Sequence, residues 1–345
     1  MIDSKSRFQS HIHLFRAIAI VLIVFQHVVP ALDWSKNEPL GRIILGLSDE
    51  SSILFVFIAG YLFQHLLVKY SFNAYFLQKL KNVLAPYLIW SVPAIVVFVV
   101  FAQREGVWTW FYGMPVWQQV GLFLLSGKHV SPYWFIPMIF LFYLAAPIFR
   151  YIDQRRQYLY LLIIPFCLLS VYIGRDGPTG PAQKAVYMLP VYMMGMWVSH
   201  YRVQFNRWMR YAWLPIFLLA AWAYVGYVLL WTEPPAYAFI VKFSFALLLV
   251  FVLDQLQLRI HSVVSYIADA SFGIYFVHSY LITGFKILYS YGTTGVFSLS
   301  GASEPFSGSV SALVILVLLI LMSSSGVVSL IRVIFGQKSK MVVGA

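Results

Sequence analysis

Arg16 and His27 are two ionisable residues, eleven positions apart, in the first long apolar segment of the chain. An α-helix turns by about 100° per residue, so eleven residues bring the second side chain to within about 20° of the first, on the same helix face. The rise per residue separates them by about 16.5 Å along the axis. Ionisable side chains in an apolar helix are costly and mark candidate functional sites. A histidine exchanges protons near neutral pH and can act as a general base.

Each of these two residues also has a structural interpretation. Arg16 lies near one end of the segment, where it could extend its side chain to the cytoplasmic headgroups, as long basic side chains do. His27 lies within the apolar run 24–29, which is too deep for a residue of the membrane interface alone. The sequence therefore favours a functional role for His27 and leaves both interpretations of Arg16 open.

Three further polar residues are candidates beside His27. His278 lies in the middle of a late apolar segment, where it could line the same cavity or form a hydrogen bond to a neighbouring helix. Asp49 and Glu50 open the second apolar segment, and acidic residues near a helix N-terminus are favourable as caps. Because the first segment ends on the side where the second begins, one of these carboxylates could instead reach His27 and orient its ring.

The composition is that of an integral membrane protein. Hydrophobic residues make up 61% of the 345 residues and charged residues only 10%, whereas a soluble domain has about 25% charged residues. The net charge of +12 does not indicate nucleic-acid binding, because the chain has no basic tract of five or more residues and its Lys and Arg lie in short loops between apolar runs. We therefore expect the lipid bilayer, and no nucleic acid, among the partners.

The apolar segments position these residues. A bilayer core of about 30 Å needs about 20 apolar residues per helix, and the chain offers ten such spans. They are near 12–32, 51–69, 83–102, 132–150, 157–174, 185–200, 209–231, 236–253, 264–289 and 309–335. Lys and Arg concentrate in one set of alternate loops, which predicts that both termini lie in the cytoplasm. We expect residues 1–345 to form a single all-α transmembrane domain.

Motifs for metals and nucleotides are missing from the sequence. It has no HExxH, no CxxC, and neither a GxxxxGK[ST] nor a GxGxxG phosphate loop. We expect no bound metal and no permanently bound cofactor, and ATP-driven transport has no support in the sequence.

Five segments together resemble the membrane acyltransferase-3 family. They are 14–20 with His27, 55–62, 75–87, 133–137 and 271–278. The similarity is greatest to the short members without a fused hydrolase-like domain, which include the intercellular-adhesin polysaccharide modifiers. Two departures from the family pattern stand out. Ala59 replaces the usual serine, and Lys79, Lys81 and Asn82 lie where the family often has an Arg-x-x-Arg pair. A lysine offers a point charge where an arginine offers a bidentate fork.

The resemblance implies an enzyme of the bacterial cytoplasmic (inner) membrane. Such a protein takes an acyl group, most often acetyl, from cytoplasmic acyl-CoA, which is a co-substrate. It places that group on a hydroxyl of an extracytoplasmic or lipid-linked glycan, as in the modification of an exopolysaccharide. A polysaccharide-synthesis complex is a further expected partner.

The resemblance also assigns expected roles to residues. The cations of Arg16, Lys79 and Lys81 would bind the phosphates of the acyl donor. His27 would act either as a base or as the carrier of an acyl-imidazole, with Asp49 or Glu50 holding its ring. The remaining expected residues would line the cavity for the acceptor: Tyr133, Trp134, Tyr275 and His278.

Two other functions are compatible with a chain of ten spans. A glycan-precursor transporter or flippase would move its substrate without covalent chemistry. A non-catalytic subunit of a polysaccharide-synthesis complex would leave acyl content unchanged when His27 is lost. No paired Gly- or Pro-broken helices occur in matching halves of the sequence, which disfavours a transporter built from inverted repeats.

Overall fold

The computed structural model describes residues 4–175, 180–230, 234–256, 261–295, 297 and 305–344, and most of these are helical. The predicted all-α class is confirmed. The chain packs as two compact units. Unit 1 contains Met1–Ile23, Arg42–Phe76 and Leu141–Asp269, and unit 2 contains Val24–Gly41, Leu77–Phe140 and Ala270–Ala345. The expected single domain stays a prediction.

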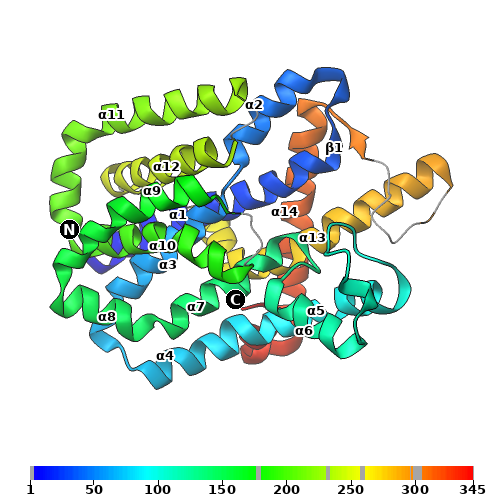
Figure 1. The fold of residues 1–345 in the computed structure, drawn as a ribbon, viewed down its shortest axis with the longest axis horizontal. Helices are drawn as coiled ribbons and strands as arrows, with labels where there is room; N and C mark the ends of the chain where they lie inside the picture. Colours follow the sequence, from blue (N-terminus) through cyan, green and yellow to red (C-terminus); the bar gives the residue numbers. More distant parts are fainter. Residues whose placement is uncertain are drawn as a thin grey trace. The chain divides into compact units, whose positions relative to one another are not determined.

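Unit 1 is an assembly of helices. It contains the first part of α1 (Ser4–Val28), most of α2 (Glu38–Ser48), then α3 (Ser52–His65), η3 (Leu67–Lys69), the start of α4 (Phe72–Lys79), α8 (Ala146–Arg155), η8 (Gln157–Leu162), α9 (Ile163–Ile173), α10 (Pro181–His200), α11 (Arg202–Leu229) and α12 (Pro234–Leu256). Helices α3 and α10 pack side by side along their length, as do α11 and α12 (Figure 1).

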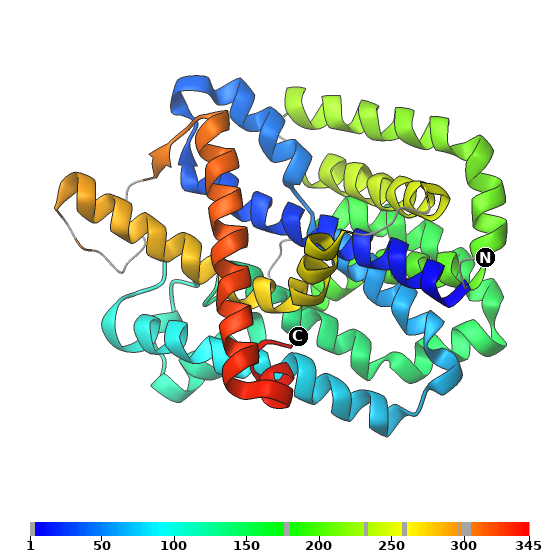
Figure 2. The ribbon, with the colours of Figure 1, turned by 180° about the vertical axis from the view of Figure 1, so that it is seen from behind.

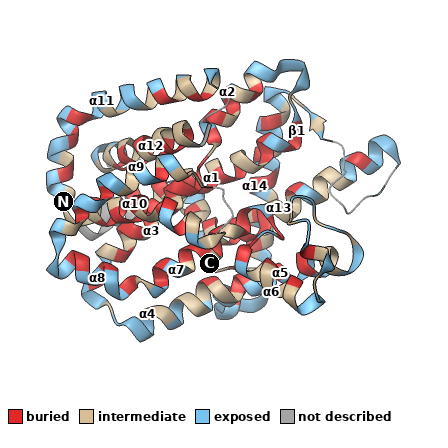
Figure 3. Ribbon diagram, viewed as in Figure 1, coloured by how far each residue is buried: buried red, intermediate tan, exposed pale blue. Residues whose placement is uncertain are grey.

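Two glycines allow α3 and α10 to approach closely. A Cβ atom on Gly60 would collide with the backbone oxygen of Tyr192, and one on Gly195 would collide with the backbone oxygen of Phe57. Small residues at facing positions are a common device for close packing of helices in membranes. Both helices are accordingly among the most buried of unit 1 (Figure 3).

Helix α1 packs against α3 through aromatic pairs. The rings of Phe15 and Phe57 stack with their centroids 5.7 Å apart. One turn away, the His11 and Tyr61 rings meet edge to face at 6.1 Å. The residue numbers of these pairs rise along α1 and fall along α3. The two helices therefore run antiparallel, as expected for consecutive spans.

Unit 2 contains the rest of the helices. Its elements are the end of α1, η1 (Val29–Ala31), β1 (Leu32–Asp33), η2 (Ser35–Asn37), η4 (Leu80–Leu84), α5 (Ala85–Val96), η5 (Val97–Phe101), η6 (Phe111–Gly113), α6 (Val116–Ser126), η7 (Ser131–Trp134), most of α7 (Phe135–Leu144) and α13 (Ser262–Thr294), β2 (Phe306–Ser307), α14 (Val310–Phe335), η9 (Gly336–Lys338) and α15 (Ser339–Val343). Strands β1 and β2 pair in parallel, Leu32 opposite Phe306.

The C-terminal helices of unit 2 close onto α5. Helix α14 leads into the short α15 (Figure 2), where the Trp90 indole N–H donates to the carbonyl of Val342 at 2.9 Å. A Cβ atom on Gly344 would collide with the ring of Phe272, and Gly344 also takes φ +67°, a conformation that favours glycine. These contacts hold α5 and α13 within the same unit. Helix α13 carries the candidate residues Tyr275 and His278, and α5 carries Ser91, which lies beside the site.

Six helical segments among the described residues are long and apolar enough to cross a membrane, or seven if the bent pair α7 and α8 is one span. The six are Ser10–Ala31, Ser35–His65, Phe72–Phe101, Arg202–Leu229, Ala236–Leu256 and Val310–Val343. The predicted spans 185–200 and 264–289 correspond to α10 and α13, which are not among these six segments. The end of the span 209–231 lies outside the described residues. Ten spans with cytoplasmic termini stay a prediction.

Helix α11 shows what the environment of unit 1 must be. Along its length, large apolar side chains such as Phe217, Trp222 and Val225 are half or more exposed, and its outer face is mostly exposed (Figure 3). A helix that exposes apolar residues over so many turns is stable in lipid rather than in water. Its 28 residues exceed the length that a bilayer core requires.

Candidate functional site

His27 and His278 lie together in unit 2. Their rings pack with centroids 5.2 Å apart and planes inclined by 43°. His27 is in the last turn of α1 and is half-buried, whereas His278, on α13, is fully buried. The structure thus brings these two candidate residues from the sequence into contact.

The hydrogen bonds of His278 fix its tautomer. Its Nδ1 lies 3.0 Å from the backbone oxygen of Ile274. A carbonyl oxygen only accepts hydrogen bonds, so Nδ1 carries the proton and donates it. The neutral ring therefore presents an unprotonated Nε2, which lies 3.4 Å from the hydroxyl of Ser279. His278 thus offers an acceptor atom beside the ring of His27.

Tyr133 and Tyr275 clamp the η7 segment to α13. The hydroxyl of Tyr133 donates to the backbone oxygen of Phe276 at 2.9 Å. In return, the hydroxyl of Tyr275 donates to the backbone oxygen of Pro132 at 2.5 Å. Their rings stack at 6.2 Å. These reciprocal bonds hold the turn of α13 that carries His278. Direct contact of either tyrosine with an acceptor stays a prediction.

Trp134 lies next to this clamp. It is half-buried, and its ring meets that of Phe135 edge to face at 6.2 Å. A Cβ atom on Gly127 would collide with the backbone of Trp134, and Gly127 takes φ +70°. The close approach of these two segments fixes the position of the Trp134 backbone, from which the indole extends.

A second histidine environment in unit 2 was not anticipated. His129 is buried, with Nδ1 3.0 Å from the backbone oxygen of Phe123 and Nε2 2.8 Å from the hydroxyl of Ser91. Its ring meets that of Tyr133 edge to face at 5.5 Å. Burial lowers the pKa of His129 to about 4, although the hydrogen bond to Phe123 opposes this. His129 lies in a loop at 127–130, and no spacing rule in the sequence connects it to Ser91 on α5.

Asp49 and Glu50 lie in unit 1, at the junction of α2 and α3. The Oε1 atom of Glu50 forms an ion pair with Nη1 of Arg175 at 2.8 Å, and the Glu50 side chain is 3% exposed. Glu50 takes φ 57°, a left-handed conformation that is costly for a residue with a side chain. Asp49 accepts a hydrogen bond from the hydroxyl of Tyr227 at 3.3 Å. A bond from either carboxylate to His27 stays a prediction.

Two cations near these carboxylates were missed in the sequence. Arg175 follows α9 and pairs with Glu50. Lys242 lies in the middle of α12, is buried, and donates from Nζ to the backbone oxygen of Leu47 at 2.5 Å. A lysine inside an apolar span is by itself a functional signal, so Lys242 could have been noticed. The position of Arg175 depends on tertiary packing.

The predicted donor-binding cations are divided between the units. Arg16 lies in unit 1, where the carboxylate of Asp269 acts on it electrostatically. Asp269 also lies 3.6 Å from Nδ1 of His13. Lys79 ends α4 and Lys81 lies in the π-helical η4. A common phosphate site for Arg16 and the two lysines stays a prediction. Among the residues that the structure describes, no group of three His, Cys, Asp or Glu side chains is placed to hold a metal ion.

Comparison with known families identifies the chain. The model of the acyltransferase-3 family, described as an acyltransferase domain, matches residues 10–328. The protein therefore belongs to the acyltransferase-3 family, and its apolar helices make it a multi-pass membrane acyltransferase. The match contains both histidines of the pair as well as Arg16 and Glu50. No curated protein and no solved structure matches the chain.

Proposed function

We propose that the protein transfers an acyl group, most simply acetyl, from cytoplasmic acyl-CoA to a hydroxyl of an extracytoplasmic or lipid-linked glycan at the bacterial cytoplasmic membrane. The observation that carries this proposal is the contact of His27 with His278 inside the acyltransferase domain. A half-buried histidine at the end of a span is accessible to substrate, and its buried neighbour holds the ring in place.

The reaction needs a base because a sugar hydroxyl is a weak nucleophile. His27 takes the proton from the hydroxyl, whose oxygen attacks the carbonyl carbon of the thioester. The carbon–sulfur bond then breaks, and the thiolate of CoA leaves and accepts the proton from the imidazolium. In the second possible course, the ring nitrogen of His27 attacks the thioester carbon and the thiolate of CoA leaves; the hydroxyl oxygen then attacks the acyl-imidazole, and the imidazole leaves as the hydroxyl proton is taken up. Both courses require His27 beside the thioester and the acceptor hydroxyl.

His278 acts through His27 as a positioning residue. Its Nδ1–H is committed to the backbone oxygen of Ile274, so the ring cannot rotate without losing that bond. The Nε2 of His278, which lies 3.4 Å from the Ser279 hydroxyl, can share its lone pair with the N–H of His27, which would leave the other nitrogen of His27 unprotonated and ready to act as a base. The tyrosine clamp supports this arrangement by fixing α13.

The donor would bind through its phosphates. Arg16, Lys79 and Lys81 supply cations for this purpose, and phosphate contacts from such residues are charge-assisted and strong. Arg16 shares a helix with His27, about 16.5 Å away along the axis. That distance suits a donor whose charged end and thioester end are joined by a long, uncharged arm.

Incubation of the purified full chain in proteoliposomes with acyl-labelled acetyl-CoA and a glycan acceptor tests this function. We expect label on the glycan and one free CoA thiol for each acyl group transferred. Glycan that crosses the bilayer without gaining label would contradict the proposal and support a transporter. Mass analysis of the surface glycan from a strain that lacks the protein should show the same loss of acyl groups.

A further inference from the structure

Unit 1 contains a cavity that none of the candidate catalytic residues lines. It has a volume of about 680 Å³, within the range of roughly 300–1,000 Å³ that is typical of small-molecule sites. Its walls come from η8, α9, α10, α11 and α12, and the apolar part includes Ile164, Met194, Trp197, Trp208 and Leu247. The lining residues Ile164 and Leu161 are 64% and 69% exposed, so the cavity is open at its side.

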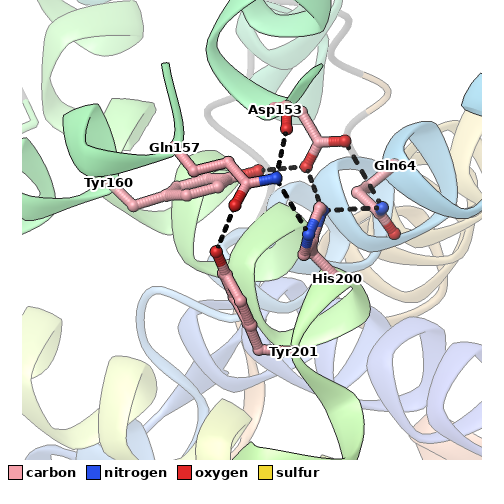
Figure 4. A network of polar contacts seen from close by, with 6 residues as sticks. All are labelled: Gln64, Asp153, Gln157, Tyr160, His200 and Tyr201. Carbon is pink, nitrogen blue, oxygen red and sulfur yellow. Dashed lines mark hydrogen bonds and ion pairs between the residues drawn. The ribbon is translucent and has the colours of Figure 1, made fainter. Parts of the chain in front are cut away.

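One end of the cavity is polar and held in place by hydrogen bonds. Gln157 and Tyr201 both line it, and the hydroxyl of Tyr201 donates to Oε1 of Gln157 at 2.6 Å. The Nε2 of Gln157 lies 3.0 Å from the backbone oxygen of Asp153 and 3.2 Å from Nε2 of His200 (Figure 4). The polar end is therefore held by hydrogen bonds within the protein.

Figure 4 shows the residues that hold His200 in place in this network. His200 Nδ1 lies 2.8 Å from Oδ1 of Asp153, which is buried. The same oxygen accepts from the hydroxyl of Tyr160 at 2.6 Å, and Gln64 approaches the other carboxylate oxygen at 3.5 Å. With its Nδ1–H donated to Asp153, His200 presents Nε2 as an acceptor, which aligns the amide of Gln157.

Two exposed arginines are adjacent in sequence to residues that line the cavity. Arg156 immediately precedes Gln157, and its guanidinium lies 6.0 Å from the ring of Tyr158, which lines the cavity. Arg207 immediately precedes the lining residue Trp208, one turn from Gln204, which also lines the cavity. Arg202, in contrast, is neutralised by an ion pair with Asp254. The Arg156 guanidinium therefore lies near a lining ring, and Arg207 is an exposed cation on the helix that contributes Gln204 and Trp208 to the lining.

We propose that this cavity binds an anionic phospholipid. Its acyl chain would occupy the apolar walls, and its phosphate would meet Arg156, Arg207 and the amide group of Gln204. An apolar cavity with an open side in a membrane protein is accessible from the bilayer, and exposed arginines adjacent to its lining residues complement a headgroup with net negative charge. The proposal does not depend on the chemistry at His27.

Purification of the full chain from mixed liposomes of phosphatidylglycerol and phosphatidylcholine, followed by mass analysis of the retained lipid, tests the site. We expect the wild type to retain phosphatidylglycerol at least five-fold over its share in the liposomes. Two variants separate the parts of the site. Arg156→Gln with Arg207→Gln should reduce the enrichment to near one, and Met194→Trp, which fills the cavity, should reduce the total retained lipid.

The matched control is Lys69→Gln with Lys338→Gln, which removes the same charge at two exposed positions away from the cavity lining and should keep the enrichment. A monodisperse elution profile confirms that each variant folds. If Met194→Trp does not fold, the double arginine variant alone tests the proposal. Equal retention of both lipids by the wild type, or undiminished enrichment in the arginine variant, would overturn the proposal. Displacement of the lipid by inorganic phosphate alone would do so as well, because it would indicate a simple anion site.

Discussion

The ring of His27 lies against the ring of His278, with centroids 5.2 Å apart, although the two residues come from the first helix of the chain and from α13. His278 is fixed by its bond to the Ile274 carbonyl and by the clamp of Tyr133 and Tyr275 on the same turn of α13. The histidine beside the candidate base is thus held by contacts to the backbone.

His278→Gln is expected to slow acyl transfer without preventing it. A misplaced base reduces the rate by roughly 10- to 100-fold while the affinity for the donor is retained. We therefore expect kcat to fall with little change in the KM for acyl-CoA, and the pH profile of kcat to shift because the tautomer of His27 is no longer selected. An unchanged pH profile together with an unchanged kcat would mean that His278 only fills space.

Gly195→Leu is expected to disrupt the packing of α3 against α10. The added side chain would have to occupy the position of the Phe57 backbone oxygen, and overpacking of this kind costs about 1–3 kcal/mol or more. The fraction of protein that stays monodisperse in detergent after a heating series measures the effect. Gly284→Ala is the control, since nothing lies within 4 Å of the added Cβ atom there, and it should behave as the wild type does.

Arg175→Gln is expected to destabilise unit 1. It removes the cation from the buried carboxylate of Glu50, and breaking one partner of a buried pair costs about 3–5 kcal/mol. The double variant Glu50→Gln with Arg175→Gln should recover part of this loss, which a double-mutant cycle on thermal stability detects. Arg210→Gln, at an exposed position on α11, is the control. Equal stability of Arg175→Gln and Arg210→Gln would show that the pair contributes nothing.

His129 is expected to make stability depend on pH. Its pKa is lowered to about 4 in the folded protein, whereas an unfolded histidine has a pKa of about 6.5. Between these values the unfolded state binds more protons, so stability falls as the pH is lowered from about 6.5 toward 4. The contribution is on the order of 3 kcal/mol at most.

Replacement of His129 by glutamine isolates this effect. Glutamine keeps a donor and an acceptor for Phe123 and Ser91 but does not titrate in this range. Between pH 8 and pH 4 the melting temperature of the wild type should fall more than that of the variant, because only the wild type has a buried imidazole at this position to protonate. Parallel curves for the two proteins over this range would count against a neutral, buried His129.

The sequence predicts the first helix well because its signal is local. The apolar run that contains Arg16 and His27 forms one continuous helix, Ser4–Val28, and the spacing rule for a shared face needs no tertiary information. The same applies to the family resemblance, whose motifs are short and ordered along the chain, and which the match over residues 10–328 confirms.

The contacts that shape the sites could not be predicted in this way. Ser91 and His129, or Glu50 and Arg175, meet only because their helices pack, and neither pair has a spacing that marks it. The π-helical turns at Leu80–Leu84 and Val97–Phe101 share no sequence signal, since the first contains Lys81 and Asn82 and the second is wholly apolar. Hydropathy locates apolar segments but not the lipid boundary, which is why ten predicted spans compare with six or seven long helices among the described residues.

Acyl transfer by His27→Ala tests the central claim most directly. The experiment compares the wild type with His27→Ala and with a control, His65→Ala, whose histidine is exposed at the end of α3. Each protein is purified, checked for monodispersity and reconstituted in proteoliposomes. Acyl-labelled acetyl-CoA and glycan are then added. We expect His65→Ala to transfer label as the wild type does and His27→Ala to lose about 100-fold or more of the rate, the contribution typical of a positioned base. A folded His27→Ala protein that acylates the glycan at the wild-type rate would contradict the proposed role of His27.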